Sequence, residues 1–545
     1  MKNKKLMCKN KIAALFIAFL YLVSILSACG TKTDANDSES SDLDNSNTTV
    51  YANTSSAEID GEGNISIDVS DAATITFSNG EITVTGKGVT ENKGVVTISD
   101  GGTYVISGES SDGRIIVNAP DEEVVLVLDN VSLECPYGSP IYIYKSDLAT
   151  INLADESTNS LTDGSEYTFE DSLSSAVDEE PNACLYSKSD LVISGKGQLI
   201  VNANYNNGIT SKDTLNIEDC DIAVNAAHHG INGKDCCIVK NAVLNIVAGG
   251  DTLRSTNDSD TTLGYISISD STLELNAGED AIQAVTSVEI NGGAYTIVAG
   301  DDGIHSDGNT TIVDGSINII ESYEGIEGQV VDISGGIINI VASDDGINAS
   351  DGSNQEEFGP PQGGMFGSSD CCINISGGVI TVDASGDGID SNGNLYVSGG
   401  ELYVSGPLDN GNSALDYDGE GTISGGIVVA ADSGGMAQNF GGNSTQGCIM
   451  LSFAESTGEK ICARDSGGNI LVSYTPTKNY SCVVISCPEI EVGKSYNIEA
   501  ANQTTSITME SLIYGNPGGP GQGGLNPGGH VGPGGHFDGG KTGMP

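Results

Sequence analysis

A motif of an acidic residue, glycine and isoleucine recurs at a nearly constant spacing through the middle of this chain. Its occurrences, some of them degenerate, are Asn207-Gly208-Ile209, His229-Gly230-Ile231, Asp251-Thr252-Leu253, Asp280-Ala281-Ile282, Asp302-Gly303-Ile304, Glu324-Gly325-Ile326, Asp345-Gly346-Ile347 and Asp387-Gly388-Ile389. Their central residues are 22, 22, 29, 22, 22, 21 and 42 residues apart, and the two long steps carry loop insertions. Alternating β-branched runs and glycine pairs lie between the motifs, which is typical of short strands and turns. The repeat predicts an all-β fold, a right-handed parallel β-helix (a solenoid of ~22-residue coils) with a small C-terminal β cap.

The two ends of the chain differ in composition from this repeat. Five lysines precede the apolar run Ile12 to Ala28, and Leu26-Ser27-Ala28-Cys29 is typical of a bacterial lipoprotein signal with lipidation at Cys29. An uncleaved signal anchor is the alternative, although the run is short for a membrane span. We therefore expect a membrane-anchored lipoprotein on the outside of a bacterial cell. The predicted segments are a signal peptide at 1–28, a disordered tether at 29–58, the β-helix at 59–446, a β cap at 447–514 and a Gly/Pro-rich tail at 515–545.

The net charge of the chain limits the classes of partner that it can bind. Lys and Arg total 21 against 75 Asp and Glu, which gives a formal net charge of −54. A protein that binds nucleic acid by neutralising phosphates needs a basic face, so this class is excluded. Cations, neutral polymers, and anions bridged through cations remain, and we expect a monomer with a polysaccharide partner.

The acids of the repeat are expected to stack. Equivalent residues of successive coils would lie about 4.8 Å apart, where two carboxylates repel by about 1 kcal/mol in water and about 3.5 kcal/mol at an effective dielectric constant of about 20. Arg254 is the one basic residue between positions 241 and 459, so a hard divalent cation, Ca²⁺, is the expected counter-charge. The alternative is that these acids are solvated and only oppose aggregation. The predicted metal ligands are Asp280, Asp301, Asp302, Asp307, Glu324, Glu327, Asp344, Asp345, Asp387 and Asp390.

Several longer motifs, in order, resemble a known family. They are Asp178-Glu179-Glu180-Pro181-Asn182-Ala183, Asn207-Gly208-Ile209-Thr210-Ser211-Lys212-Asp213, Ser322-Tyr323-Glu324-Gly325-Ile326-Glu327-Gly328 and Ala414-Leu415-Asp416-Tyr417-Asp418-Gly419. Over about residues 58 to 514 the chain is similar to the clostridial calcium-binding, carbohydrate-binding β-helix family. The resemblance implies a pectate-lyase-like fold and calcium-aided attachment to cellulose and polygalacturonate, without established catalysis. The Asn207, His229 and Asp251-Thr252 variants depart from the family pattern and put a cation site in those coils in doubt.

Tyrosines are the expected side chains for stacking against sugar rings, because the chain has no tryptophan. The predicted carbohydrate-binding residues are Tyr323, Tyr396, Tyr403, Tyr417 and His305, and for each tyrosine plain strand-surface packing is the alternative.

Catalysis is the competing function. A calcium-dependent lyase needs a base, for which Arg254 is the candidate in the regular coils, and an inverting hydrolase could use Asp301 and Asp302 beside His305. We find no Arg-x-Lys substrate clamp, and predict no catalytic residues. A structural adhesin or spacer is the third class.

The cysteines argue for packing rather than metal binding. Of 13 cysteines, Cys8 lies in the predicted signal peptide and Cys29 is the predicted lipidation site, which leaves an odd number of 11. No Cys-x-x-Cys spacing indicates zinc, so we expect buried free thiols, with a Cys482–Cys487 disulfide as the alternative.

Overall fold

The structure is a computed structural model that describes residues 57–59, 65–67, 69–78, 80–169, 172–177, 180–351 and 370–515. The predicted lipidation signal, most of the tether, the insertion after Asp351 and the Gly/Pro tail lie outside these residues. Within the described part, every regular element is a β-strand, and no helix there is long and apolar enough to span a membrane.

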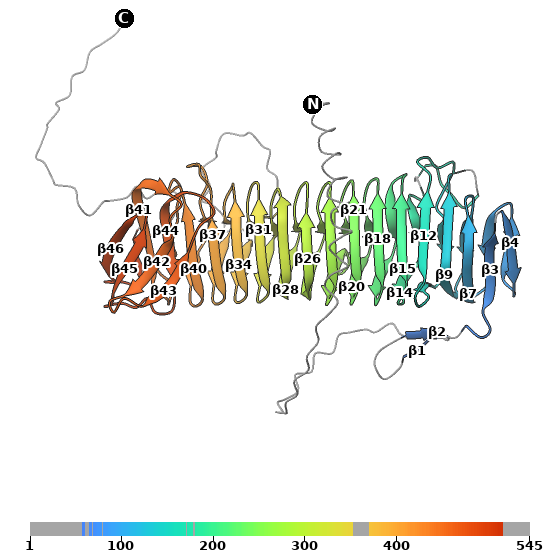
Figure 1. Ribbon diagram of the computed structural model, residues 1–545, viewed down its shortest axis with the longest axis horizontal. Coiled ribbons are helices and arrows are strands. Elements are labelled where there is room, and N and C mark those ends of the chain that lie inside the picture. The colour runs from blue at the N-terminus through green and yellow to red at the C-terminus, as the bar shows by residue number, and fades with distance from the viewer. Residues whose placement is uncertain are drawn as a thin grey trace, which may run out of the picture. The chain divides into compact units, whose positions relative to one another are not determined.

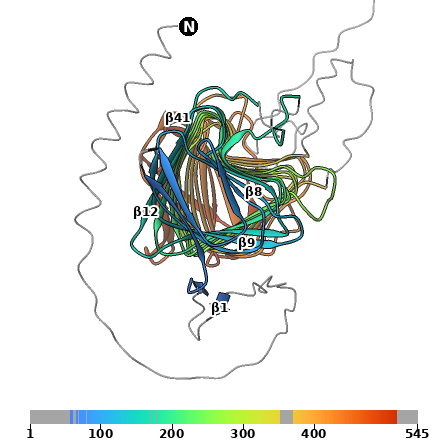
Figure 2. The ribbon, with the colours of Figure 1, turned by 90° about the vertical axis from the view of Figure 1, so that its right-hand side faces the viewer.

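One circuit of the chain, here called a coil, contains three strands. A regular example is β29 (Ile326–Gly328), β30 (Val330–Ile333) and β31 (Ile337–Ala342). Each strand pairs in parallel with the equivalent strand of the next coil, so that Ile326 lies opposite Ile347 and Val331 opposite Ile373. Successive coils therefore stack in chain order, as the colour sequence of Figure 1 and the view along the stack in Figure 2 show.

The first strand of each coil belongs to one 14-stranded sheet. In spatial order its strands are β38 (Leu415–Tyr417), β35 (Ile389–Ser391), β32 (Ile347–Ala349), β29, β27 (Ile304–Ser306), β25 (Ile282–Ala284), β22 (Leu253–Ser255), β19 (Ile231–Gly233), β16 (Asn207–Ser211), β13 (Ala183–Ser187), β10 (Ile141–Lys145), β8 (Arg114–Asn118), β6 (Val95–Ile98) and β5 (Val89–Asn92).

The other two strands of each coil form a second sheet that closes on itself. It contains β3 (Ala73–Ser78), β4 (Glu81–Thr85), β7 (Gly102–Ser110), β9 (Glu123–Cys135), β11 (Leu148–Leu153), β12 (Thr158–Asp163), β14 (Asp190–Ser194), β15 (Gln198–Ala203), β17 (Thr214–Glu218), β18 (Asp221–Ala226), β20 (Cys236–Lys240), β21 (Val243–Ala248), β23 (Tyr265–Ser269), β24 (Thr272–Ala277), β26 (Ser287–Val298), β28 (Asn309–Ser322), β30, β31, β33 (Cys372–Ile375), β34 (Val379–Ala384), β36 (Asn394–Val397), β37 (Glu401–Ser405), β39 (Gly421–Ile423), β40 (Ile427–Asp432), β41 (Cys448–Thr457), β44 (Tyr480–Ser486) and β47 (Ile513–Tyr514).

This closure corrects the predicted fold class. The all-β content and the parallel pairing of the repeats are observed, but the prediction of an open right-handed β-helix solenoid is wrong, because the second sheet is a closed barrel. The physical reason is that some strands run through a coil corner without a break. Thus β9 pairs with both β11 and β12, and β26 pairs with both β23 and β24, which joins the hydrogen bonding of two coil faces.

The aliphatic residue of the repeat forms the predicted inward ladder. Ile304, Ile326, Ile347 and Ile389 are all fully buried and lie opposite one another, and each contributes roughly 1.5–3 kcal/mol of burial. The glycine before it is required by close packing, because a Cβ on Gly303 would lie 2.6 Å from Gly325 O.

The C-terminal part departs from the stacked coils. β44 pairs antiparallel with β40 and β41, and β43 (Ile470–Tyr474), β42 (Ile461–Asp465), β45 (Ser495–Ala500) and β46 (Gln503–Thr508) form a separate four-stranded sheet. This part has its own hydrophobic core, which includes Tyr480 and Tyr496. Near the start of the described sequence, β1 (Ala57–Ile59) and β2 (Ile65–Ile67) form a two-stranded antiparallel sheet.

The cysteines match the sequence-based expectation. All 11 in the described residues are free, and only Cys372 among them is not fully buried. They pack as small hydrophobic side chains, and Cys482 and Cys487 are not joined.

Candidate functional site

The residue that follows the buried aliphatic residue in each coil points to the outer face of the 14-stranded sheet. Strand pairing aligns these positions in a row, here called the outer row. Its members are Ile116, Tyr142, Tyr186, Thr210, Asn232, Arg254, Gln283, His305, Glu327, Asn348, Asp390 and Asp416. Along the stack the row begins with apolar and aromatic residues, continues with neutral polar residues on both sides of Arg254, and ends with His305 and three carboxylates, among which Asn348 lies.

The first three members of the row are covered. Ile116, Tyr142 and Tyr186 pack in a cluster with Leu173 and Ala183, and both tyrosines have no exposed surface. The Tyr142 hydroxyl donates to Leu173 O at 2.9 Å. The segment after β12 thus closes this end of the outer face.

Thr210 and three amide side chains of the row, together called the amide section, hold polar atoms that lack partners. Among the described residues, Thr210 Oγ1, Asn232 Oδ1, Gln283 Oε1 and Asn348 Oδ1 are buried without a hydrogen bond. The side chains of Thr210 and Asn348 are only 2% and 7% exposed. Unpaired buried polar atoms are rare in folded proteins, so four in one row distinguish this stretch of the sheet from the rest.

A second column contains the acids of the repeat, and its register has a structural cause. Asp280 Oδ1 accepts the backbone N–H of Asp302 at 2.9 Å, and Asp302 Oδ1 accepts that of Glu324 at 3.1 Å. The neutral residues at the same position do likewise, since Asn207 Oδ1 accepts from His229 N at 3.2 Å and His229 Nδ1 accepts from Asp251 N at 3.0 Å. Alignment of the acids therefore follows from a cap between coils and is not by itself a sign of a metal.

Acids of the column and the row meet in two clusters. The first, here called the histidine-bridged cluster, contains Asp280, Asp302, His305, Glu324 and Glu327. His305 Nδ1 lies 3.0 Å from both Asp302 Oδ2 and Glu327 Oε2. Although burial opposes it, hydrogen bonding to these two carboxylates raises the pKa of His305 to about 11. The cluster therefore contains its own cation.

For two acids of this cluster, the His305 cation does not offset the effect of burial. Burial, and then Glu327, raise the pKa of Glu324 to about 8, and burial raises the pKa of Asp280 to about 7. The single imidazolium does not neutralise all four carboxylates.

The second, here called the carboxylate-only cluster, contains Asp345, Asp387 and Asp390, with oxygens within 4.8 Å of one another. Burial, followed by the neighbouring acids, raises the pKa of Asp390 to about 8 and that of Asp387 to about 7. Burial also raises the pKa of Asp345 to about 6. In the described part of the chain, no Lys, Arg or His forms an ion pair with any of these three, and the charged neighbours that raise their pKa values are other acids.

The donor set of the carboxylate-only cluster fits a calcium ion. Oxygens on opposite sides of Ca²⁺ are about 4.6–5.2 Å apart, because Ca–O distances are about 2.3–2.6 Å. Three carboxylates supply only part of the six to eight oxygens that Ca²⁺ takes. The rest would come from water or from a ligand on the outer face, where Asp390 and its strand neighbour Asp416 lie.

A third group lies where the acid column ends. The Arg254 guanidinium is 3.3 Å from Asp251 Oδ2 and also contacts His229 Nε2. His228, His229 and Glu279 form a further group within ligand distance, but the Arg254 cation occupies the open nitrogen of His229. The doubt raised from the sequence about a cation in these coils thus has a structural basis.

The remaining predicted metal ligands do not join these groups. Asp301, Asp307 and Asp344 belong to none of the clusters. Asp307 instead accepts from His305 Nε2 at 3.1 Å, and Asp344 hydrogen-bonds Tyr323, which raises the pKa of Tyr323 to about 12.

The predicted tyrosines do not form one surface. Tyr323 is 47% exposed beside the acid column, whereas Tyr396 on β36 and Tyr403 on β37 lie on the closed sheet. The prediction that Tyr417 binds carbohydrate is wrong, because this residue is 5% exposed and its hydroxyl donates to Asn439 O, which leaves no ring face for a sugar.

Sequence reasoning missed the amides of the outer row, although their signal was present. Thr210, Asn232, Gln283 and Asn348 each directly follow the repeat's aliphatic residue or its equivalent. Period-two alternation places that position on the opposite face from the buried ladder.

Comparison with known proteins gives the family. A family model described as "carbohydrate-binding domain-containing protein" matches residues 92–356. A carbohydrate-binding domain-containing protein of Acetivibrio thermocellus is 36% identical over 223 residues, which are 40% of this chain and 76% of that protein. A solved structure, the polysaccharide lyase-like protein from C. thermocellum as a gadolinium derivative, has 34% identity and a TM-score of 0.42, over 44% of this chain and 96% of that one. The chain belongs to the family of carbohydrate-binding domain-containing proteins.

Proposed function

We propose that this protein binds an acidic, plant-type polysaccharide such as polygalacturonate on the outer face of its 14-stranded sheet, with the help of calcium. The observation that carries the proposal is the carboxylate-only cluster, in which three acids converge without a protein cation. A protein with a net charge of −54 repels a polyuronate unless a cation lies between them.

Asp345, Asp387 and Asp390 would hold the ion, and bound Ca²⁺ supplies a positive charge that a sugar carboxylate can ligate. Toward the other end of the row, the half-buried amides of Asn232 and Gln283 would hydrogen-bond sugar hydroxyls. Each such bond is worth about 0.5–1.5 kcal/mol.

Cellulose is the second candidate ligand, and the neutral amides of the row favour it. A neutral glucan needs no cation, so its binding would depend on the amide section and not on the carboxylate-only cluster.

We propose binding without catalysis. Arg254, the candidate base for a lyase, pairs with Asp251 at 3.3 Å. His305 bridges two carboxylates, and although burial opposes it, their hydrogen bonds raise the pKa of His305 to about 11. The imidazole therefore stays protonated near neutral pH and cannot accept a proton. Lyase or inverting-hydrolase activity would appear as cleavage of polygalacturonate, and a structural adhesin or spacer would bind no glycan.

We also propose that the protein is a lipoprotein anchored through Cys29 outside the cell, on the strength of the Leu26-Ser27-Ala28-Cys29 sequence. Metabolic labelling with a fatty acid tests this, and a Cys29→Ala variant that stays labelled would contradict it.

The test of function is polygalacturonate binding with calcium and with EGTA, using Asp387→Asn/Asp390→Asn. Asparagine keeps the acceptor that Asp387 offers to Ser413 N, as Asn207 does in an earlier coil. The matched control is Glu289→Gln/Asp314→Asn, which removes two exposed acids from β26 and β28.

We expect calcium-dependent binding by the native and control proteins, and a loss of at least tenfold in the cluster variant. Binding that is equal with EGTA, or equal in the cluster variant, would refute the calcium-dependent function. Release of reducing or unsaturated sugar would refute the non-catalytic assignment.

A further inference from the structure

The outer face of the 14-stranded sheet is covered at one end and open over the rest of its length. Every residue of β13 and of β16 is buried. From β19 to β38 the central residue of each strand of this sheet is half-buried, with the buried Asn348 of β32 as the exception. The change falls between β16 and β19, which pair directly with each other.

The cover is the segment between β12 and β13, here called the strap. The structure describes its residues 164–169, 172–177 and 180–182. Within the strap, Ser175 N donates to Glu180 O at 2.7 Å and Glu180 N donates to Ser175 O at 2.9 Å. From the sheet, the Tyr142 hydroxyl donates to Leu173 O. The strap is therefore tied both to itself and to the strands beneath it.

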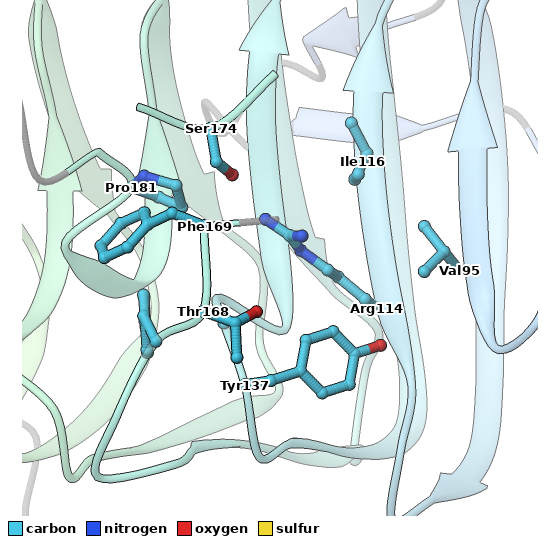
Figure 3. A pocket seen from close by; sticks show the side chains of 10 residues that line it. Val95, Arg114, Ile116, Tyr137, Thr168, Phe169, Ser174 and Pro181 are labelled. Atoms are coloured by element: carbon cyan, nitrogen blue, oxygen red, sulfur yellow. The ribbon is translucent and has the colours of Figure 1, made fainter. Parts of the chain in front are cut away.

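The strap also lies against β8. Figure 3 shows Ser174 and Pro181 of the strap together with Arg114 and Ile116 of β8, around a pocket of about 260 Å³. This volume is below the range of about 300–1,000 Å³ usual for drug-sized ligands. A polysaccharide chain cannot pass beneath the strap through so small a space.

The side of the strap that faces the open part of the sheet is held by charge. Glu180 Oε2 lies 2.7 Å from Lys188 Nζ, and Glu180 Oε1 lies 2.9 Å from Lys212 Nζ. These lysines directly follow β13 and β16 in the sequence. Asn207 N of β16 also donates to Asn182 O at 3.1 Å. The strap is thus fixed as far as β16, and no strand beyond β16 shares these contacts.

The ligand of the proposed function must run along the stack toward this strap. It would contact the carboxylate-only cluster, beside β32 and β35, and the amides of Gln283 on β25 and Asn232 on β19. From β35 to β19 there are six strand spacings of about 4.8 Å, or about 29 Å in all. One spacing further lies β16, to which the strap is bonded.

We propose that the strap restricts this face to the ends of polysaccharide chains, with the terminal sugar residue beside Asn232 and the chain running from there to the carboxylate-only cluster. An internal stretch of chain continues in both directions, so its next residue would overlap the strap. It could avoid the strap only by leaving the sheet before Asn232 and losing the contacts there. The proposal rests on the proposed function for its ligand and its face, and it adds which part of that ligand binds.

The test is the number of protein molecules bound to each chain of polygalacturonate. Size-exclusion chromatography with light scattering gives this number for sized fractions of increasing length, in calcium low enough that the fractions alone stay monomeric. One variant lacks the strap, with residues 165–179 replaced by Gly-Ser-Gly-Ser. The matched control is Val177→Ser, which changes an exposed strap residue and leaves the strap in place. Thermal unfolding verifies that each variant is folded.

We expect the native chain and Val177→Ser to bind one protein per polysaccharide chain, whatever the length of the fraction. The variant without the strap should bind in a number that rises with length, because internal stretches become accessible to it. If that variant does not fold, the stoichiometry of the native chain decides the matter. A bulky tag on the reducing end then identifies the terminus: loss of binding assigns the reducing end, unchanged one-per-chain binding assigns the other end, and either result supports the proposal.

Two results would overturn the proposal: a native stoichiometry that rises with chain length, or one-per-chain binding that persists in the folded variant without the strap. The first would leave the proposed function intact, since calcium-dependent binding would still be observed. Absence of binding by the native chain at every length would instead refute the proposed function, and this proposal with it.

Discussion

Without calcium, the carboxylate-only cluster should destabilise the protein as pH rises from 5 to 8. Asp345, Asp387 and Asp390 have pKa values raised by burial to about 6, 7 and 8, whereas an unfolded aspartate titrates near about 3.9. Between these values the native state holds more protons than the unfolded chain. The free energy of unfolding therefore falls with increasing pH in this window.

The size of the effect follows from the linkage between pKa and stability. Each pKa unit corresponds to about 1.36 kcal/mol, so one group shifted by about 3 units would cost about 4 kcal/mol once fully ionised. The three groups repel one another, and protonation of one relieves the others. We therefore expect about 2–4 kcal/mol for the cluster as a whole.

The assay is urea unfolding in EGTA at pH 5 and pH 8, for the native chain and for Asp387→Asn/Asp390→Asn. Other acids such as Glu324 titrate in both proteins, so the difference between the two proteins isolates the cluster. The variant should be more stable than the native chain at pH 8, and this advantage should be about 2–4 kcal/mol smaller at pH 5. Saturating calcium should reverse the order at pH 8, because only the native cluster binds the ion.

Two results would refute this reasoning. If the native chain and the variant differ equally at both pH values in EGTA, the acids are not held protonated by their surroundings. If calcium stabilises both proteins alike, the ion binds elsewhere. The Glu289→Gln/Asp314→Asn control should show neither effect.

Three further predictions concern the scaffold. Gly303→Ala should lower the free energy of unfolding by about 1–3 kcal/mol through overpacking against Gly325 O. The control Gly442→Ala has no atom within 4 Å of the added Cβ and should change the free energy of unfolding little. Equal urea midpoints for the two variants would contradict this prediction. Asn207→Ala removes the acceptor for His229 N and should cost about 1 kcal/mol, while Asn207→Asp should retain the bond, as measured by thermal unfolding. Although burial opposes it, hydrogen bonds from Lys188 and Lys212 lower the pKa of Glu180 to about 2. The stabilisation from ionised Glu180 is therefore present above about pH 4.5 and is lost as pH falls toward 2. Glu180→Gln should be destabilising at pH 7 and neutral near pH 2, and a difference in stability that does not depend on pH would exclude the ion pair as its cause.

The candidate site could be predicted in part. Spacing alone brought Asp345 and Asp387 together, because equivalent positions of successive coils must stack, and Asp390 follows Asp387 by three residues. It did not separate the two acid clusters, since that depends on His305 lying 3.0 Å from both Asp302 and Glu327. The cluster that seemed richest in ligands from the sequence contains its own cation, and the smaller one does not.

The unpaired oxygens of the outer row could be found only in the structure. Thr210 and Asn348 are ordinary polar residues in the sequence, and only burial leaves their oxygens without partners.

The sequence by itself determined the coil length, the inward aliphatic ladder and the acid column, because each follows from a periodic pattern that parallel strand pairing must bring into register. The tertiary structure alone decided whether the coils close, which acids keep an unbalanced charge and where a pocket remains open. Closure depends on strands such as β9 and β26 that carry hydrogen bonding through a corner. Charge balance and pockets depend on distances between coils and inserted segments, and a repeat counted along the chain does not contain those distances.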